Sequence, residues 1–301
     1  MGPQHRGCRA TLVACVLALA ACGGATPSPT PSPSRAAQAA DPTVAAAGDI
    51  SPPQSGHQAD TARLVLRLGP TRVLALGDLQ YPRGQLADFR RYYDPTWGRF
   101  KSHTRPVPGN HEYMTRGAAG YLGYWGTLAR PDGRTYYSFD LGGWHLVALD
   151  SNIDRNTGSA QVTWLRRDLT ATKKPCVLAY WHAPLFSSGV RHGGDPSERP
   201  FWTELSARRA DLVLNGHEHN YERFAPQTPT GAADARGVRE FVVGTGGNSA
   251  YPFGPAKPHS QKRITGQYGV LELSLHPAGY SWRYLEVGGK VLDRGGPVAC
   301  H

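Results

Sequence analysis

Residues 73–81 read VLALGDLQY, in which a short apolar run stops at Gly77-Asp78. A continuous apolar run bounded by glycine is typical of a strand that is buried on both faces. The aspartate that follows would lie where the backbone leaves the sheet. The stretch therefore predicts a buried strand with a carboxylate at its carboxyl end.

The same arrangement recurs along the chain. Short apolar strands at 44–47, 176–180 and 212–214, and the Pro106-Val107-Pro108 segment, also run into a polar residue. These strand-end residues are Asp49, Asn110, His182, His217 and His219. In open α/β sheets the carboxyl ends of strands are where binding sites assemble, so we expect these side chains to converge.

Helical patterns separate the strands. They cover about 58–68, 85–93 and 159–169, and the last places Val162, Leu165 and Leu169 on one face. A hairpin is predicted from 136–139 and 144–149, and further strands from 241–243, 270–275 and 280–287. This alternation indicates an α/β fold, with no repeat and no second domain boundary after Val44.

Composition narrows the class of protein. The chain has 301 residues, 40% hydrophobic residues and a net charge of +10. The apolar content excludes a disordered chain, and five cysteines are too few for a disulfide-built scaffold. The positive charge favours an anionic partner. No basic stripe is interleaved with aromatic residues, so a nucleic acid is not expected as a dedicated partner.

The first 43 residues are predicted to lie outside the fold. Residues 1–21 have the basic start and apolar run of a signal peptide, and they end in Leu19-Ala20-Ala21-Cys22, which resembles a lipobox. Residues 22–43 are rich in Pro, Ser and Ala and indicate an extended tether. We expect an extracytoplasmic lipoprotein held to the membrane by lipid on Cys22. An ordinary secretory signal and an O-glycosylated stalk are the alternatives.

Removal of the predicted leader would change the net charge and the number of cysteines. The leader holds two of the 33 basic residues and none of the 23 acidic ones, so the mature chain carries +8. Cys176 and Cys300 would remain as an even pair in an oxidising compartment, where they either form a disulfide or stay as free thiols.

The strand-end residues have the chemistry of metal ligands. One aspartate after a strand is often only a helix cap. Several carboxylate, amide and imidazole groups at equivalent strand ends instead favour a metal site with mixed oxygen and nitrogen ligands. Six or seven ligands are too many for one tetrahedral ion and suit two ions that share a carboxylate.

Five blocks occur in a fixed order: Gly48-Asp49, Gly77-Asp78-Leu79-Gln80-Tyr81, Gly109-Asn110-His111-Glu112, Trp181-His182 and Gly216-His217-Glu218-His219. Together they resemble the calcineurin-like metallophosphoesterases. Tyr81 and the continuation 219–223 resemble the purple acid phosphatase branch. The resemblance implies a layered α/β/β/α sandwich of two mixed β-sheets flanked by helices, with residues 44–301 as the catalytic domain.

The resemblance also implies two sets of ligands. One metal ion would take Asp49, Asp78, Tyr81 and His219. The other would take Asp78, Asn110, His182 and His217, with Asp78 bridging. Iron paired with zinc, manganese or a second iron is expected. His111 and His192 would act on the phosphate as catalytic residues.

The implied activity is hydrolysis of phosphate monoesters by a metal-bound hydroxide, as in acid phosphatases. A phosphodiesterase acting on nucleotides or phospholipid headgroups is the alternative within enzymes. A non-catalytic surface lipoprotein that binds phosphate or metal is the alternative from another class.

The sequence departs from its relatives at two places. Ser51 stands where many relatives have a histidine, and residues 22–43 cannot form the N-terminal β-sandwich of plant members.

Overall fold

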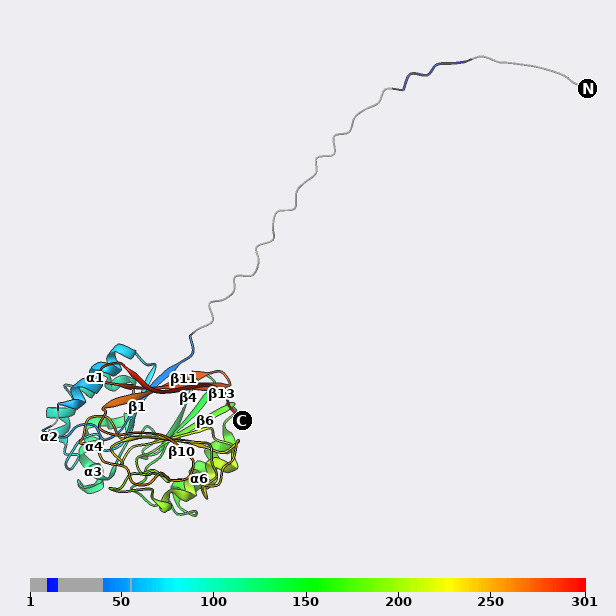
Figure 1. Cartoon of the computed structure of the whole chain (residues 1–301). Helices are drawn as coiled ribbons and strands as arrows, with labels where there is room; N and C mark the ends of the chain where they lie inside the picture. The colour runs from blue at the N-terminus through cyan, green and yellow to red at the C-terminus, as the bar shows by residue number, and fades with distance from the viewer. Residues whose placement is uncertain (1–9, 16–39, 55) are drawn as a thin grey trace, which may run out of the picture. The chain divides into compact units, whose positions relative to one another are not determined.

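The computed structural model describes residues 10–15, 40–54 and 56–301. The folded unit runs from Ala40 to His301 (Figure 1). Cys22 and most of the predicted leader and tether lie outside the described residues, so the predicted lipid attachment has no structural counterpart here. No helix in the described ranges is long and apolar enough to cross a membrane.

Two mixed sheets form the centre of the folded unit. The first has the order β13-β12-β11-β1-β2-β3 and the second the order β10-β8-β9-β7-β6-β5-β4. The first comprises β1 (Thr43–Ala47), β2 (Arg72–Leu76), β3 (Thr104–Val107), β11 (Gly269–His276), β12 (Gly279–Glu286) and β13 (Val291–Ala299). The second comprises β4 (Tyr137–Leu141), β5 (Trp144–Ala148), β6 (Cys176–Tyr180), β7 (Leu212–Asn215), β8 (Tyr221–Phe224), β9 (Arg239–Val243) and β10 (Ser260–Ile264).

Each sheet combines parallel and antiparallel strands. β1, β2 and β3 run parallel in the first sheet, as do β5, β6, β7 and β9 in the second. The predicted hairpin is the antiparallel pair β4 and β5. Because parallel strands end at the same edge, five strand-end motifs of the sequence are brought to one side of the two sheets.

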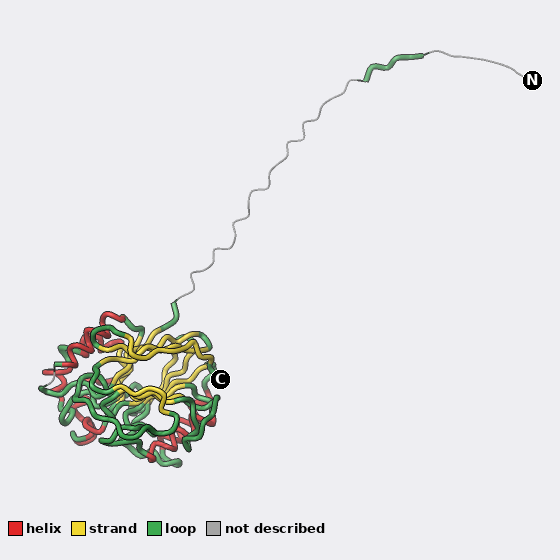
Figure 2. The backbone as a smooth tube through the Cα atoms, viewed as in Figure 1, coloured by secondary structure: helices red, strands yellow, loops and turns green. Residues whose placement is uncertain are grey.

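The helices lie outside the sheets, as Figure 2 shows. They are α1 (His57–Leu68), α2 (Leu86–Asp88), α3 (Asn110–Tyr113), α4 (Ala119–Trp125), α5 (Ala160–Ala171) and α6 (Arg199–Ala207). α1 ends at Gly69, whose φ of 57° is the left-handed conformation that glycine adopts without cost. α5 starts after Ser159, whose hydroxyl accepts a hydrogen bond from the Val162 amide at 3.2 Å.

Alternating side chains of the strands fill two apolar layers. On β6, Leu178 and Tyr180 belong to the core between the two sheets, whereas Val177 and Ala179 belong to the core beneath α5 and α6. Successive side chains of a strand point to opposite faces, so a continuous apolar run is what two-sided burial requires. The predicted sandwich of helix, sheet, sheet and helix is confirmed.

The predicted helix at 85–93 forms with a change of pitch. α2 passes at once into a π-helical turn, Phe89–Tyr93, in which the Asp94 amide donates to the Phe89 carbonyl at 2.8 Å. This wider turn buries the rings of Phe89 and Tyr93, which pack against Tyr124. The sequence predicted a regular polar helix over 85–93, and the packing of these rings accounts for the π-helical turn.

Cys176 and Cys300 form the disulfide that the sequence left open. Their Cα atoms lie 5.4 Å apart and 124 positions separate them in the chain. Asp211 fixes the same region, because its carboxylate accepts hydrogen bonds from the amides of Val177 and His301 at 2.9 and 3.1 Å. The C-terminal residues are thereby held against the start of β6.

His145 on β5 predicts a pH dependence of stability. Its ring nitrogens lie 2.8 Å from Asp140 and 2.8 Å from Asp168. Burial lowers the pKa of His145, but the hydrogen bonds to the two aspartates outweigh burial and raise the pKa above 6.5. The stabilisation is therefore complete below the unfolded-state pKa of about 6.5 and is lost as the pH rises through the folded-state value.

We expect His145→Gln to lower the free energy of unfolding by about 1 kcal/mol near pH 5.5, and by less near pH 9. Urea unfolding at the two pH values measures the difference. An equal loss at both would show that packing of the ring, rather than its charge, stabilises the fold.

Candidate metal centre

Six of the seven predicted ligands lie at the carboxyl ends of parallel strands from both sheets, and the seventh, Tyr81, follows Asp78 in the loop after β2. Asp49 follows β1, Asp78 follows β2, and Asn110 follows β3 at the start of α3. His182 follows β6 in the second sheet, and His217 and His219 follow β7. The two sheets therefore contribute carboxylates and imidazoles from opposite sides of one site.

Three of these residues have left-handed backbones. The φ angles are 59° at Asp49, 48° at Asp78 and 71° at His217. Such conformations cost about 1–3 kcal/mol each in non-glycine residues and persist where surrounding structure holds them. At the end of β1, Asp49 itself makes the turn. Gly48 supplies space, because a Cβ there would lie 2.9 Å from the Leu76 carbonyl oxygen.

The first group of donor atoms surrounds the Tyr81 hydroxyl. This oxygen lies 2.9 Å from Oδ1 of Asp49, 3.1 Å from Oδ2 of Asp78 and 3.1 Å from Nε2 of His219. Nε2 of His219 is also 3.2 Å from Asp49. These are the four residues of the first predicted ligand set, in mutual contact.

The second group lies on the other side of Asp78. Nε2 of His182 is 3.3 Å from Oδ2 of Asp78 and 3.1 Å from Nδ1 of His217. Ligand atoms of these three residues lie within 4.8 Å of one another, as a single ion requires. Oδ2 of Asp78 thus contacts members of both groups.

Asn110 adds an oxygen without a partner. Its Oδ1 is buried and accepts no hydrogen bond from the described residues. The amide of the next residue, His111, donates to Oδ1 of Asp78 at 2.9 Å, which places Asn110 close to the shared carboxylate. A buried amide oxygen without a partner, close to a carboxylate, fits a cation.

Backbone carbonyls orient two of the imidazoles. Nδ1 of His182 donates to the Leu76 carbonyl at 2.8 Å, and Nδ1 of His219 donates to the Ser249 carbonyl at 2.6 Å. In each ring the proton on Nδ1 is committed, and Nε2 faces the carboxylates. Ligating histidines are commonly fixed in this way, so the geometry suits metal binding.

The two residues predicted to act on the phosphate are at the rim. Nδ1 of His111 is 2.6 Å from the Pro82 carbonyl, and its Nε2 is 3.8 Å from Asp78. The ring of His192 stacks on that of His217 with 4.1 Å between centroids. Both side chains therefore lie next to the donor groups rather than within them.

The comparisons with known proteins agree with this geometry. The sequence profile described as calcineurin-like phosphoesterase matches residues 42–221. This chain belongs to the calcineurin-like phosphoesterase family. The match begins at the first strand and ends just after His219, so it contains every predicted ligand.

Similar curated proteins include several purple acid phosphatases. Purple acid phosphatase 15 of Arabidopsis thaliana is 28% identical over 257 residues, covering 73% of this chain and 46% of the relative. Purple acid phosphatase 22 of the same plant is 36% identical over 118 residues, covering 38% of this chain and 27% of the relative. This phosphoesterase spans about half the length of the first curated relatives that it matches.

Solved structures share the fold. The purple acid phosphatase PPD1 of yellow lupin superposes with a TM-score of 0.69 at 19% identity, covering 85% of this chain and 53% of the other. GAP50, described as the anchor in the inner membrane complex of Plasmodium, gives 0.69 at 15% identity and covers 87% and 90%. The predicted family, its purple acid phosphatase-like branch and the fold are confirmed.

Electrostatics of the phosphoesterase site hold both aspartates ionised. Burial raises the pKa of Asp78, but His182 and His111 outweigh burial and lower it. Burial likewise opposes ionisation of Asp49, and His219 and His182 lower its pKa. Two buried carboxylates that stay ionised form a site that attracts cations.

The pKa values of the imidazoles of His182 and His217 are shifted in opposite directions. Burial lowers the pKa of His182, but the carboxylates of Asp78 and Asp49 outweigh it and raise the pKa to about 10. Burial together with the charge of His182 lowers the pKa of His217 to about 3. The carboxylates thus favour the protonated form of His182, whereas His217 is favoured as a neutral ring with a free lone pair.

Tyr81 is held as a neutral phenol in this setting. Burial, together with the charges of Asp49 and Asp78, raises its pKa well above 10. A tyrosinate here requires a strongly charged cation close to the oxygen. The hydroxyl lies within the first donor group, so an ion held there would be close to this oxygen.

Glu112 and Tyr251 are site residues to which the sequence assigned no role. Oε1 of Glu112 accepts from the amides of Leu79 and Gln80 at 2.9 and 3.1 Å, and Oε2 accepts from Gly109 at 2.7 Å. Glu112 therefore joins the loops that carry Asp78 and Asn110. The sequence could have pointed to Glu112, because it is the last residue of the block Gly109-Asn110-His111-Glu112. The ring of Tyr251 stacks on that of His219 at 3.8 Å, which no local pattern predicts.

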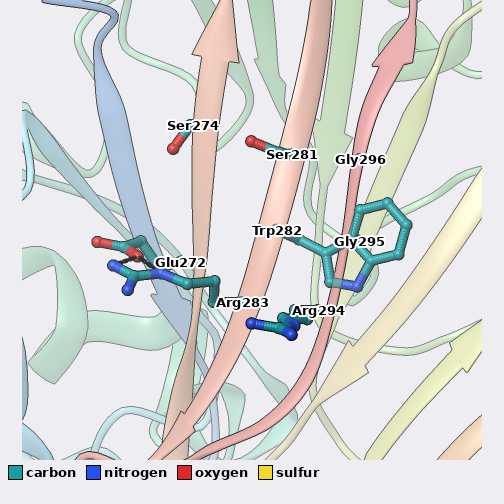
Figure 3. A pocket seen from close by; sticks show the side chains of 8 residues that line it. All are labelled: Glu272, Ser274, Ser281, Trp282, Arg283, Arg294, Gly295 and Gly296. Atoms are coloured by element: carbon teal, nitrogen blue, oxygen red, sulfur yellow. Dashed lines mark hydrogen bonds and ion pairs between the residues drawn. The ribbon is translucent and has the colours of Figure 1, made fainter.

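Two other features do not belong to the centre. A groove of about 460 Å³ on β11, β12 and β13 is lined by Arg283 and Arg294 (Figure 3). Ser274 in this groove pairs with Thr43 at the start of β1, whereas Asp49 follows the end of that strand. Cys176, Asp211 and Cys300 also cluster, but the two sulfur atoms are joined in the disulfide.

Proposed function

We propose that the protein hydrolyses phosphate monoesters with two metal ions. The observation that carries the proposal is the pair of donor groups that share Oδ2 of Asp78. Asp49, Asp78, Tyr81 and His219 would hold one ion, and Asp78, Asn110, His182 and His217 the other. Bound ions would lower the pKa of a coordinated water and offset the charge of the phosphate.

The protein's own residues would place the ester and handle its protons. His111 is suited to the leaving oxygen, because the Pro82 carbonyl fixes Nδ1 and leaves Nε2 facing the centre. His192 stacks on His217 beside the second donor group and would contact the phosphate oxygens. The names of the relatives support a monoester as the substrate.

The deciding experiment joins metal analysis to an absorption spectrum and a panel of phosphoesters. We expect two metal ions per chain and faster turnover of 4-nitrophenyl phosphate than of its bis ester. Preference for the bis ester would instead assign a phosphodiesterase. If the protein is chelated, then reloaded with iron, zinc or manganese, and still turns over no ester, the assignment as an enzyme is overturned.

Tyr81 makes the iron content visible. Tyrosinate bound to Fe(III) absorbs visible light, so we expect a violet protein whose colour disappears in Tyr81→Phe. The loss should exceed about 90% of the band, because the phenolate oxygen itself is removed. A colourless wild-type protein with stoichiometric zinc would exclude iron while leaving the two-metal proposal in place.

His111→Ala separates proton handling from metal binding. We expect kcat/KM for 4-nitrophenyl phosphate to fall about 10²-fold, which is the usual contribution of a positioned acid or base. Metal content should stay unchanged, because His111 lies outside both donor groups. Metal loss in this variant would mean that His111 supports the centre structurally.

A non-catalytic binding protein is the second candidate. GAP50 shares the fold and is described as an anchor, so the fold alone does not require catalysis. Retention of both donor groups favours the enzyme. Stoichiometric metal and phosphate binding without turnover of any ester in the panel would favour the binding protein.

We also propose an extracytoplasmic location with a lipid anchor at Cys22, followed by the tether of residues 22–43. The Leu19-Ala20-Ala21-Cys22 sequence supports it. Labelling of cells with a palmitate analogue, compared between wild type and Cys22→Ser, tests the anchor. Equal labelling of the two proteins would refute attachment at this residue.

A further inference from the structure

Three buried glutamates hold the segment 185–193, which follows His182 and carries His192. Glu240 on β9 accepts from the Leu185 amide at 3.2 Å. Glu222 on β8 accepts from the Ser188 amide at 2.7 Å. Glu218, between β7 and β8, accepts from the amides of His192 and Gly193. The segment is therefore fixed along its length by carboxylates of the second sheet.

Glu218 makes the contact nearest the metal centre. Its Oε1 accepts both hydrogen bonds, at 2.6 Å from the His192 amide and 2.7 Å from the Gly193 amide. The side chain is fully buried, and Oε2 has no hydrogen-bond partner in the described residues. Charge-assisted bonds of this length are stronger than bonds between neutral groups. Their cost is a buried carboxylate with one unsatisfied oxygen.

Gly189 leaves the space that this contact needs. A Cβ at this position would lie 2.2 Å from the carboxyl carbon of Glu218, closer than any real contact. Gly189 also pairs with Phe253, which brings the loop of Tyr251 against the same segment. The segment and the carboxylate are therefore fitted to each other.

The contact determines where the imidazole of His192 lies. Glu218 fixes the backbone of His192, and the ring then stacks on His217 at 4.1 Å with 29° between the planes. His217, a predicted ligand, directly precedes Glu218 in the chain. Glu218 in turn holds the backbone of His192, whose ring stacks on His217. A side chain that served only to fill the core would not need an oxygen that accepts two backbone hydrogen bonds.

We propose that Glu218 is a positioning residue that seats His192 over the metal centre by binding the amides of residues 192 and 193. The effect on turnover rests on the proposed function, because it presumes that His192 contacts the phosphate. The placement itself does not rest on it and has its own readout.

Hydrogen exchange measured by mass spectrometry tests the placement without activity. In Glu218→Ala, we expect amides within 186–194 to exchange at least about 10-fold faster than in wild type, since two hydrogen bonds are lost. Glu218→Gln should stay near wild type, because its amide oxygen can accept the same two bonds. Gly189→Ala should reproduce the faster exchange by displacing the carboxylate. Unchanged exchange in both alanine variants would overturn the proposal.

A double-mutant cycle tests the route of the effect. We expect Glu218→Ala to lower kcat/KM for 4-nitrophenyl phosphate about 10-fold or more, and Glu218→Gln to retain most of the activity. In a His192→Ala background, Glu218→Ala should cause less than about a 2-fold further loss, because both changes remove the same contact. Independent, multiplying losses would show that Glu218 acts on the metal ligands directly and would overturn the proposal.

Glu272→Gln is the matched control. Glu272 is another buried glutamate, but it pairs with Arg283 on the first sheet, away from the segment. It should change neither the exchange of 186–194 nor the kinetics. If wild type hydrolyses no ester, the proposed function fails while the exchange experiment still decides the placement of His192.

Discussion

Replacing Asp78 with asparagine is expected to lower kcat/KM for 4-nitrophenyl phosphate by about 10³-fold or more, equivalent to about 4 kcal/mol of transition-state stabilisation. Oδ2 of Asp78 contacts Tyr81 of the first donor group and His182 of the second. A neutral amide in its place removes the anion that offsets the repulsion between two cations. Metal content should therefore fall together with activity.

Asparagine is the sharper substitution because it preserves the fold. Asp78 has a φ of 48°, a conformation that asparagine tolerates and alanine does not. The amide oxygen can still accept the hydrogen bond that the His111 amide makes to Oδ1. A loss of activity in Asp78→Asn can then be assigned to charge and metal binding rather than to unfolding.

Circular dichroism, metal analysis and kinetics on the same preparation complete the test. Asp140→Asn is the matched control, since Asp140 is about half exposed and pairs with His145 far along the second sheet. It should keep full activity and metal content. An Asp78→Asn protein that retains two metal ions and wild-type turnover would refute the shared-carboxylate centre.

The positions of the donor groups were predictable because they depend on strand ends. An apolar run followed by Asp, Asn or His is visible in the sequence, and parallel strands necessarily end at one edge. The division into two groups around Asp78 needed the resemblance to a family, because side-chain contacts between residues more than 100 positions apart leave no local pattern. His182 and Asp78 are such a pair.

The less regular elements were not predicted, and their sequences show why. β13 contains Gly295, Gly296 and Pro297, and its pairing with β12 has two register shifts, so no alternating pattern marks it. β10 has the polar sequence SQKRI at the edge of its sheet. Glu218 and Tyr251 act through contacts that only the folded chain creates.

The disulfide predicts the largest effect on stability. Cys176→Ser with Cys300→Ser removes a cross-link between residues 124 positions apart. In the chain-entropy account, closing a loop of about 100 residues stabilises a fold by about 4.7 kcal/mol. We expect a loss of about 4–5 kcal/mol in the free energy of unfolding, and a fall of about 10–20 °C in Tm for a domain of this size.

Activity at 25 °C should change less than about 2-fold, because Cys176 begins β6 while His182 lies beyond its other end. Asp211→Asn separates the cross-link from tail docking, since Asp211 binds the Val177 and His301 amides without a covalent bond. That variant should lose about 1–3 kcal/mol. Guanidinium unfolding of wild type and the two variants measures both losses in the free energy of unfolding. Equal midpoints for wild type and the double serine variant would show that noncovalent docking alone holds the tail, and that the cross-link adds no stability to the metal centre's scaffold.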